Sequence, residues 1–148
     1  LEEYYNKTST QIREMLREVT EIESIGDSCY NLARTINRKR RGSIDFTEKQ
    51  YEHIHQMFGL TDSALTQMIA LVEDVHHTVD VNKSFNIENE INNYRSQLKN
   101  QNIIDVNNKE YSYQMGIHYM DIIGECEKLG DYVVNVVEAH SDVKEKKA

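Results

Sequence analysis

The chain contains no proline, and only six of its 148 residues are glycine. Proline breaks helix interiors because it lacks an N–H group and its ring clashes with the preceding turn, so its absence leaves long helices uninterrupted. No apolar run approaches the roughly 20 residues that a membrane-spanning helix needs. The composition therefore predicts long helices in a water-soluble domain, and 39% hydrophobic residues can supply a core for one domain of this length.

Cysteine is even scarcer than glycine, and positively charged residues are outnumbered by negatively charged ones. Cys29 and Cys126 stand alone, without a CxxC or Cys/His metal spacing, and we expect isolated buried thiols in a reducing compartment. The net charge of −8 argues against a nucleic-acid partner, whose phosphates attract basic surfaces. No signal peptide is recognisable, and the chain begins with Leu1 rather than methionine, so we expect a piece of a longer protein.

Apolar residues that recur every three to four positions predict the secondary structure. The predicted helices span about 3–41, 48–79, 83–100 and 109–140, with a turn at 43–46, a loop at 101–108 and a fraying charged tail at 141–148. Asp45 or Thr47 is the expected N-cap of the second helix. The sequence thus predicts the all-α class, as an antiparallel four-helix bundle that occupies 1–148 as a single domain.

Each predicted helix carries an apolar stripe that we expect to face the core. In the first helix the stripe consists of Ile12, Met15, Val19, Ile22, Gly26, Cys29, Ala33 and Ile36. In the second it consists of Tyr51, Ile54, Phe58, Thr61, Leu65, Met68, Val72, Val75 and Val79. The third helix has the weaker stripe Ile87, Ile91, Tyr94 and Leu98.

One short pattern occurs twice, on the first and the last predicted helix. The shared residues, all offset by 104 positions, are Glu21/Glu125, Glu23/Glu127, Gly26/Gly130, Asp27/Asp131 and Asn31/Asn135. Residues at i, i+4 and i+8 lie close to one another on a helix surface, so each Glu-Asp-Asn trio forms one polar stripe beside the apolar one. A helical glycine costs about 1 kcal/mol relative to alanine, and its recurrence predicts a close approach of another helix.

The paired carboxylates indicate a metal site. Two acidic side chains at i and i+4 repel each other, and a cation held by their oxygen atoms removes this repulsion. The alternative is an ordinary solvated acidic flank, which is common in a chain this acidic. The duplication favours the metal site, with the two copies at the same height on antiparallel neighbours.

These residues resemble the repeated signature of the PhoU family of phosphate-transport regulators. Glu23-Ser-Ile-Gly-Asp27 with Asn31, and Glu127-Lys-Leu-Gly-Asp131 with Asn135, match its Glu-Arg-Ile-Gly-Asp-like segment, although both lack the usual arginine. The resemblance implies three-helix repeats that end in the signature helix, with 3–41 as the last helix of one repeat and 47–140 as a full second repeat.

The same resemblance implies metal ligands and partners. It makes Glu23, Asp27, Glu127 and Asp131 candidate ligands of a divalent or ferric ion (iron, manganese, magnesium or zinc), with Asn31 and Asn135 positioned to support them. The layout is most similar to the soluble C-terminal PhoU-like domain of a bacterial sodium/phosphate cotransporter. It implies a regulatory domain rather than an enzyme, on the cytoplasmic side of the inner membrane. The implied partner is a transporter portion in the same polypeptide, and a second copy is a further candidate.

Other patterns leave alternatives open. Glu73 and His76 have the Glu-xx-His spacing of four-helix di-metal enzymes, but such sites also need further glutamates from facing helices. A purely structural or dimerising bundle is the third alternative. The basic run Arg38–Arg41 is explained by a helix C-terminus, where cations are favoured, and would also suit anionic lipid headgroups.

Overall fold

The computed structural model describes residues 1–42 and 45–147, and the side chains as far as Asp142. All regular structure in these residues is helical, which confirms the all-α prediction. The helices are α1 (Glu2–Arg41), α2 (Glu48–Glu73), α3 (Val81–Asn107) and α4 (Tyr113–Lys147). Ser43 and Ile44, in the first half of the predicted turn, lie outside the described residues.

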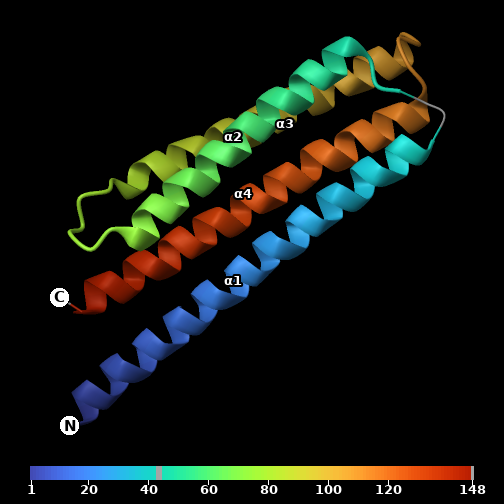
Figure 1. Cartoon of the computed structure of the whole chain (residues 1–148). Coiled ribbons are helices and arrows are strands. Elements are labelled where there is room, and N and C mark those ends of the chain that lie inside the picture. The colour runs from blue at the N-terminus through green and yellow to red at the C-terminus, as the bar shows by residue number, and fades with distance from the viewer. Residues whose placement is uncertain (43–44, 148) are drawn as a thin grey trace.

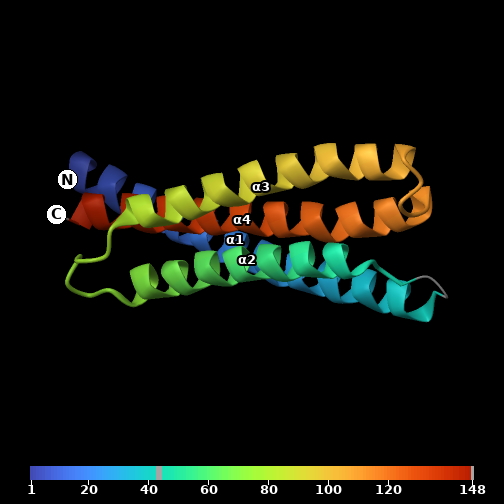
Figure 2. The same ribbon diagram turned by 90° about the horizontal axis from the view of Figure 1, so that it is seen from above.

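Helix α4 is the centre of the arrangement (Figure 1). It packs against all three other helices, and α2 also packs against α3, whereas α1 packs mainly against α4 and contacts α2 near its own end, through Lys39 and Tyr51. Figure 2 shows α2 and α3 on either side of α4, which runs antiparallel to α1. The predicted bundle is therefore closed around α2, α3 and α4, and α1 extends it on one side.

The core follows from this arrangement. Its fully buried residues come mainly from α4, with one or two contributions from each facing helix; the largest are Met57, Ile91, Ile122, Ile123, Leu129, Val133, Val136 and Val137. The predicted stripes of the second and third helices are confirmed at Ile54, Met68, Ile91 and Leu98, all of which are buried.

The prediction that the apolar stripe of the first helix faces the core was wrong. Ile12, Met15 and Val19 are each more than half exposed, and Cys29 is exposed as well. Helix α1 instead buries a neighbouring face that contains Ile25 and Ser28. Periodicity locates an apolar stripe on a helix, but it does not reveal whether another helix covers that stripe.

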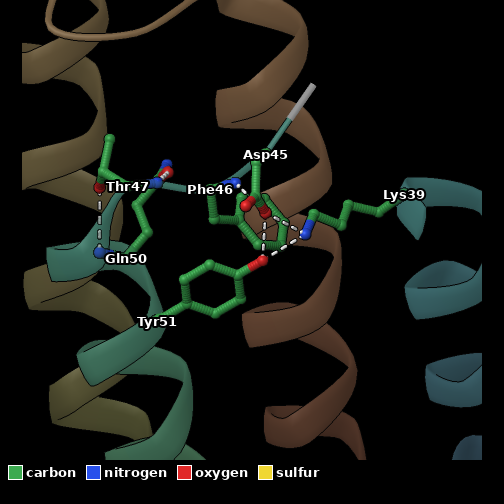
Figure 3. Close-up of polar contacts among 6 residues, drawn as sticks. All are labelled: Lys39, Asp45, Phe46, Thr47, Gln50 and Tyr51. Carbon is green, nitrogen blue, oxygen red and sulfur yellow. Dashed lines mark hydrogen bonds and ion pairs between the residues drawn. The ribbon is translucent and has the colours of Figure 1, made fainter. Parts of the chain in front are cut away.

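The second helix begins where expected and ends earlier. Thr47 is the N-cap: its hydroxyl accepts from the backbone N–H of Gln50, whose side chain accepts in return from the N–H of Thr47 (Figure 3). The helix ends at Glu73 rather than near Val79, because the Asp74 carboxylate accepts from the N–H groups of His76 and Val79 and bends the chain into a turn.

The boundary between the third and fourth helices also differs from the prediction. Residues 101–107, predicted as a loop, continue α3 to Asn107, and the turn follows at Lys109, whose φ of 59° is left-handed. Helix α4 then starts at Tyr113. The hydroxyl of the preceding residue, Ser112, accepts a hydrogen bond from the backbone N–H of Met115. At its other end α4 continues to Lys147, through most of the tail that was expected to fray.

Candidate functional site

The two copies of the duplicated motif lie side by side, because α1 and α4 run antiparallel. Asn31 Nδ2 donates to Oε1 of Glu125 at 3.4 Å, and Asn135 Nδ2 donates to Oε2 of Glu21 at 3.2 Å. Each bond joins an asparagine of one copy to a glutamate of the other, and the two bonds occupy equivalent places. The copies are therefore related by a local two-fold axis. They lie at the same height along α1 and α4, as predicted.

These bonds give the asparagines a different role from the predicted one. Asn31 and Asn135 were expected to support metal ligands, but their amides bind Glu125 and Glu21, which the sequence had marked only as shared positions. Glu125 also accepts a 2.6 Å hydrogen bond from the buried hydroxyl of Ser28. The duplicated glutamates and asparagines thus hold α1 against α4.

The carboxylates of the first copy lie on the open side of α1. Glu23 and Asp27 are both exposed, and α1 has no helix packed over this side in the described structure. The glycine between them, Gly26, has no atom within 4 Å of the position that a Cβ would take. The close approach predicted at Gly26 is therefore wrong for the chain by itself.

The second copy faces α3 and is more crowded. A Cβ added at Gly130 would lie 3.3 Å from Cδ1 of Ile91, so the close approach predicted there is confirmed. Arg95 of α3 forms an ion pair with Glu127. Partial removal from water, followed by the neighbouring carboxylates of Glu127 and Glu88, raises the pKa of Asp131 above its ordinary value.

The fit of a metal ion to these residues is incomplete. Among the described residues no three histidine, cysteine or acidic side chains are grouped so that they could hold an ion. Glu23 and Asp27 supply two carboxylates without a third ligand, and Arg95 already neutralises Glu127. The pKa of Asp131 is raised by burial and then by the carboxylates of Glu127 and Glu88, and a cation would relieve the repulsion from these carboxylates.

A polar groove of about 540 Å³ lies beside the second copy, between α1, α3 and α4. Its lining includes Glu127 and Asp131 together with the cations Arg34, Arg38 and Arg95. Both signs of charge are therefore present at its wall, which makes the groove suitable for polar ligands rather than for apolar ones.

The basic run at the end of α1 is built into the α1–α2 connection. Lys39 donates to the Asp45 carboxylate and the Tyr51 hydroxyl, and its Nζ lies 4.8 Å from the centre of the Phe46 ring (Figure 3). The hydrogen bond from Lys39 lowers the pKa of Asp45. This structural role of Lys39 was not predicted, since the sequence marked the run only as a helix end.

Two smaller predictions concern single residues. Helix α2 ends at Glu73, so Glu73 and His76 do not share a helix and this pair does not form a di-metal element. Cys126 is buried as expected, and burial raises the pKa of its thiol to about 11, but Cys29 is exposed.

The sequence model of the PhoU domain matches residues 54–139, which is more than half of the chain. The chain belongs to the PhoU family. This assignment agrees with the helical bundle and associates the domain with the regulation of phosphate homeostasis rather than with catalysis. No curated protein and no solved structure has significant similarity to the chain. In the described part of the PhoU domain, none of the helices is long and apolar enough to cross a membrane.

Proposed function

We propose that this PhoU domain regulates phosphate uptake as the cytoplasmic part of a sodium/phosphate cotransporter encoded in the same polypeptide. The observation that carries the proposal is the PhoU match at 54–139, together with the duplicated signature that joins α1 to α4. Arg38, Arg40 and Arg41, at the end of α1, form no ion pair with the residues that the structure describes, and they suit a surface that lies near anionic lipid headgroups.

A test in cells measures phosphate uptake. Deleting the codons for residues 1–148 from the full gene should leave transport itself intact but remove the fall in uptake that follows growth in high phosphate. Gly130→Leu, which forces a side chain against Ile91 in the core, should reproduce the deletion. Gly59→Leu, at an exposed glycine with free space, is the matched control. Unchanged regulation in the deletion strain would refute the proposal.

We further propose that a divalent or ferric ion adds to this regulation by binding at Glu127 and Asp131. Their oxygen atoms are suitable ligands, and the ion would relieve the carboxylate crowding around Asp131. Because Arg95 is paired with Glu127, the ion would have to displace the guanidinium group. Glu23 and Asp27 are a second, weaker candidate pair, because in the described structure no second helix packs beside them on the open side of α1.

Thermal unfolding in EDTA, and then with manganese, iron, magnesium or zinc added, tests the metal proposal. Ligand linkage predicts about 2.7 kcal/mol of stabilisation at a hundredfold excess over the dissociation constant. Arg95→Met should strengthen binding by freeing Glu127, Asp131→Asn should abolish it, and Asp27→Asn should have little effect. No change in melting temperature with any metal, for either the parent or Arg95→Met, would exclude the site without affecting the uptake proposal.

A further inference from the structure

The contact between α1 and α4 carries one pair of charges at one end and the reverse pair at the other. In the C-terminal half of α4, Glu138 forms an ion pair with Arg17 of α1 at 3.2 Å. The 104-residue offset converts these two positions to Arg34 of α1 and Asp121 of α4. The local two-fold axis therefore places an arginine and an aspartate at the equivalent place, with the two signs exchanged between the helices.

Arg34 and Asp121 do not repeat the ion pair. The guanidinium group of Arg34 lies over the ring of Tyr30, 5.8 Å from the ring centre, and no described residue forms an ion pair with Asp121. Both residues line the polar groove of about 540 Å³, together with Arg38, which lies one turn farther along α1. Two arginines therefore stand at this end of the groove without an anionic partner among the described residues.

The exposure of Arg34 does not result from a missing neighbour of its helix. Its equivalent, Glu138, belongs to α4, which packs against all three other helices. The side chain of Glu138 nevertheless remains 45% exposed. This position of the repeat thus faces solvent even where the neighbouring helices are in place, and the exposed charge of Arg34 is available to a ligand from solution.

The carboxylates that line the groove differ in their availability to a ligand beside Arg34. Glu125 and Glu127 are already bound by other side chains of the bundle. Asp131 lies ten residues from Asp121, about 15 Å along α4. Among the described carboxylates that line the groove, Asp121 is therefore the one that an anion beside the two arginines would meet.

A carboxylate beside two arginines suits an oxyanion that still carries a proton. Guanidinium groups bind oxyanions through charge-assisted hydrogen bonds, whereas an ionised carboxylate only accepts hydrogen bonds. Inorganic phosphate keeps at least one proton at neutral pH, and its hydroxyl can donate to Asp121. Sulfate and the phosphodiester groups of lipids carry no such proton, so the carboxylate would repel them. This end of the groove thus favours phosphate over other abundant anions.

We propose that Arg34, Arg38 and Asp121 form a binding site for inorganic phosphate in the groove between α1 and α4. The two arginines donate to the phosphate oxygen atoms, and Asp121 accepts from the phosphate hydroxyl. The choice of phosphate among protonated oxyanions rests on the proposed role in phosphate uptake, for which this site supplies the signal. The site shares no residue with the metal pair Glu127 and Asp131, so the two can be tested separately.

Isothermal titration calorimetry with inorganic phosphate, in a metal-free buffer without other oxyanions, tests the site. Arg34→Gln and Arg38→Gln should each weaken binding by about tenfold or more, because each removes a charge-assisted hydrogen bond. Arg13→Gln, at an exposed arginine of α1 that forms no ion pair in the described structure, is the matched control and should bind like the parent. Circular dichroism should be the same for all three variants, because each of these arginines is exposed.

Sulfate tests the part played by Asp121. The parent should bind sulfate about tenfold more weakly than phosphate, and Asp121→Asn should bring the two affinities together, because the asparagine amide can donate as well as accept. Vesicles of phosphatidylglycerol test the other source of phosphate groups and should leave phosphate binding unchanged. Displacement of phosphate by the vesicles would assign Arg34 and Arg38 to lipid headgroups and overturn the proposal.

Uptake measurements separate this inference from the proposed function. Arg34→Gln combined with Arg38→Gln in the full gene should leave transport intact and remove the fall in uptake at high phosphate. A parent chain that binds no phosphate at millimolar concentration, or one whose affinity both arginine variants leave unchanged, would overturn the site. If deletion of residues 1–148 removes the regulation in the same strain, the proposed function stands without it.

Discussion

Asn135 donates a hydrogen bond of 3.2 Å from its Nδ2 atom to Oε2 of Glu21, and so joins the second copy of the duplicated motif to the first. Asn31 and Glu125 form the equivalent bond on the other side of the local two-fold axis. Because both bonds cross from α1 to α4, the duplicated signature first of all builds the contact between these helices. Its outward-facing carboxylates are then available for other partners.

Removal of the Asn135–Glu21 bond should destabilise the α1–α4 contact. We expect Asn135→Ala and Glu21→Ala each to lower the free energy of unfolding by about 1 kcal/mol, the usual net value of such a bond. The double variant should lose less than the sum, with a coupling of about 0.5–1 kcal/mol in a urea-denaturation cycle. Asn37→Ala, at an exposed asparagine of α1, is the control. Strictly additive losses would mean that the bond contributes nothing.

The two equivalent glycines should respond differently to alanine. Gly26→Ala should stabilise the monomer by up to about 1 kcal/mol through helix propensity, because its Cβ would meet no other atom. Gly130→Ala should gain less or lose stability, since its Cβ would press on Ile91 at 3.3 Å. Urea unfolding of the two single variants and the parent protein measures both. Equal gains would show that Ile91 adjusts without cost.

The ionised side chain of Asp131 should lower the stability of the folded protein at neutral pH. Its pKa is raised above the ordinary value of 3.8, so the folded protein binds this proton more tightly than the unfolded chain, and stability falls as pH rises through the folded pKa. Asp131→Asn should therefore raise the melting temperature at pH 7, and the gain should disappear below about pH 4. Asp62→Asn, at an exposed aspartate of α2, is the matched control for the change of charge. A constant gain at both pH values would exclude titration of Asp131 as the cause.

The two thiols should differ in reactivity. Cys29 is exposed, whereas burial raises the pKa of Cys126 to about 11 and keeps it protonated near pH 8. A disulfide reagent such as DTNB at pH 8 should therefore label one thiol per folded chain quickly and the second only after denaturation. The Cys29→Ser variant should react slowly until it unfolds. Rapid labelling of two thiols in the native protein would mean that the α4 core opens readily.

The spacing of apolar residues was sufficient to predict the helices, but it did not predict all of their boundaries. The stripe that includes Ile54 and Met68 placed α2 in the core correctly, because α2 packs against both α3 and α4. The end of α2 depended on Asp74, whose carboxylate competes with the helix for backbone N–H groups. The end of α3 depended on Lys109 in a left-handed conformation, which no apolar pattern signals.

The candidate site was located by sequence in part only. The duplication identified Glu23, Asp27, Glu127 and Asp131, and it predicted correctly that the two copies lie level. It could not show that Arg95, 32 residues away along the chain, pairs with Glu127, because nothing in the local pattern of α3 specifies which helix it faces.

The sequence by itself determined that the chain forms long amphipathic helices and that two of them carry the same motif, since both properties follow from local spacing along the chain. The tertiary structure alone decided which apolar stripe is covered. Val19 and Ile123 are equivalent in sequence, yet Val19 is 62% exposed and Ile123 is fully buried. The difference arises because α2 and α3 pack against α4 and not along the outer face of α1, and the burial of a side chain depends on which helices lie above it in space.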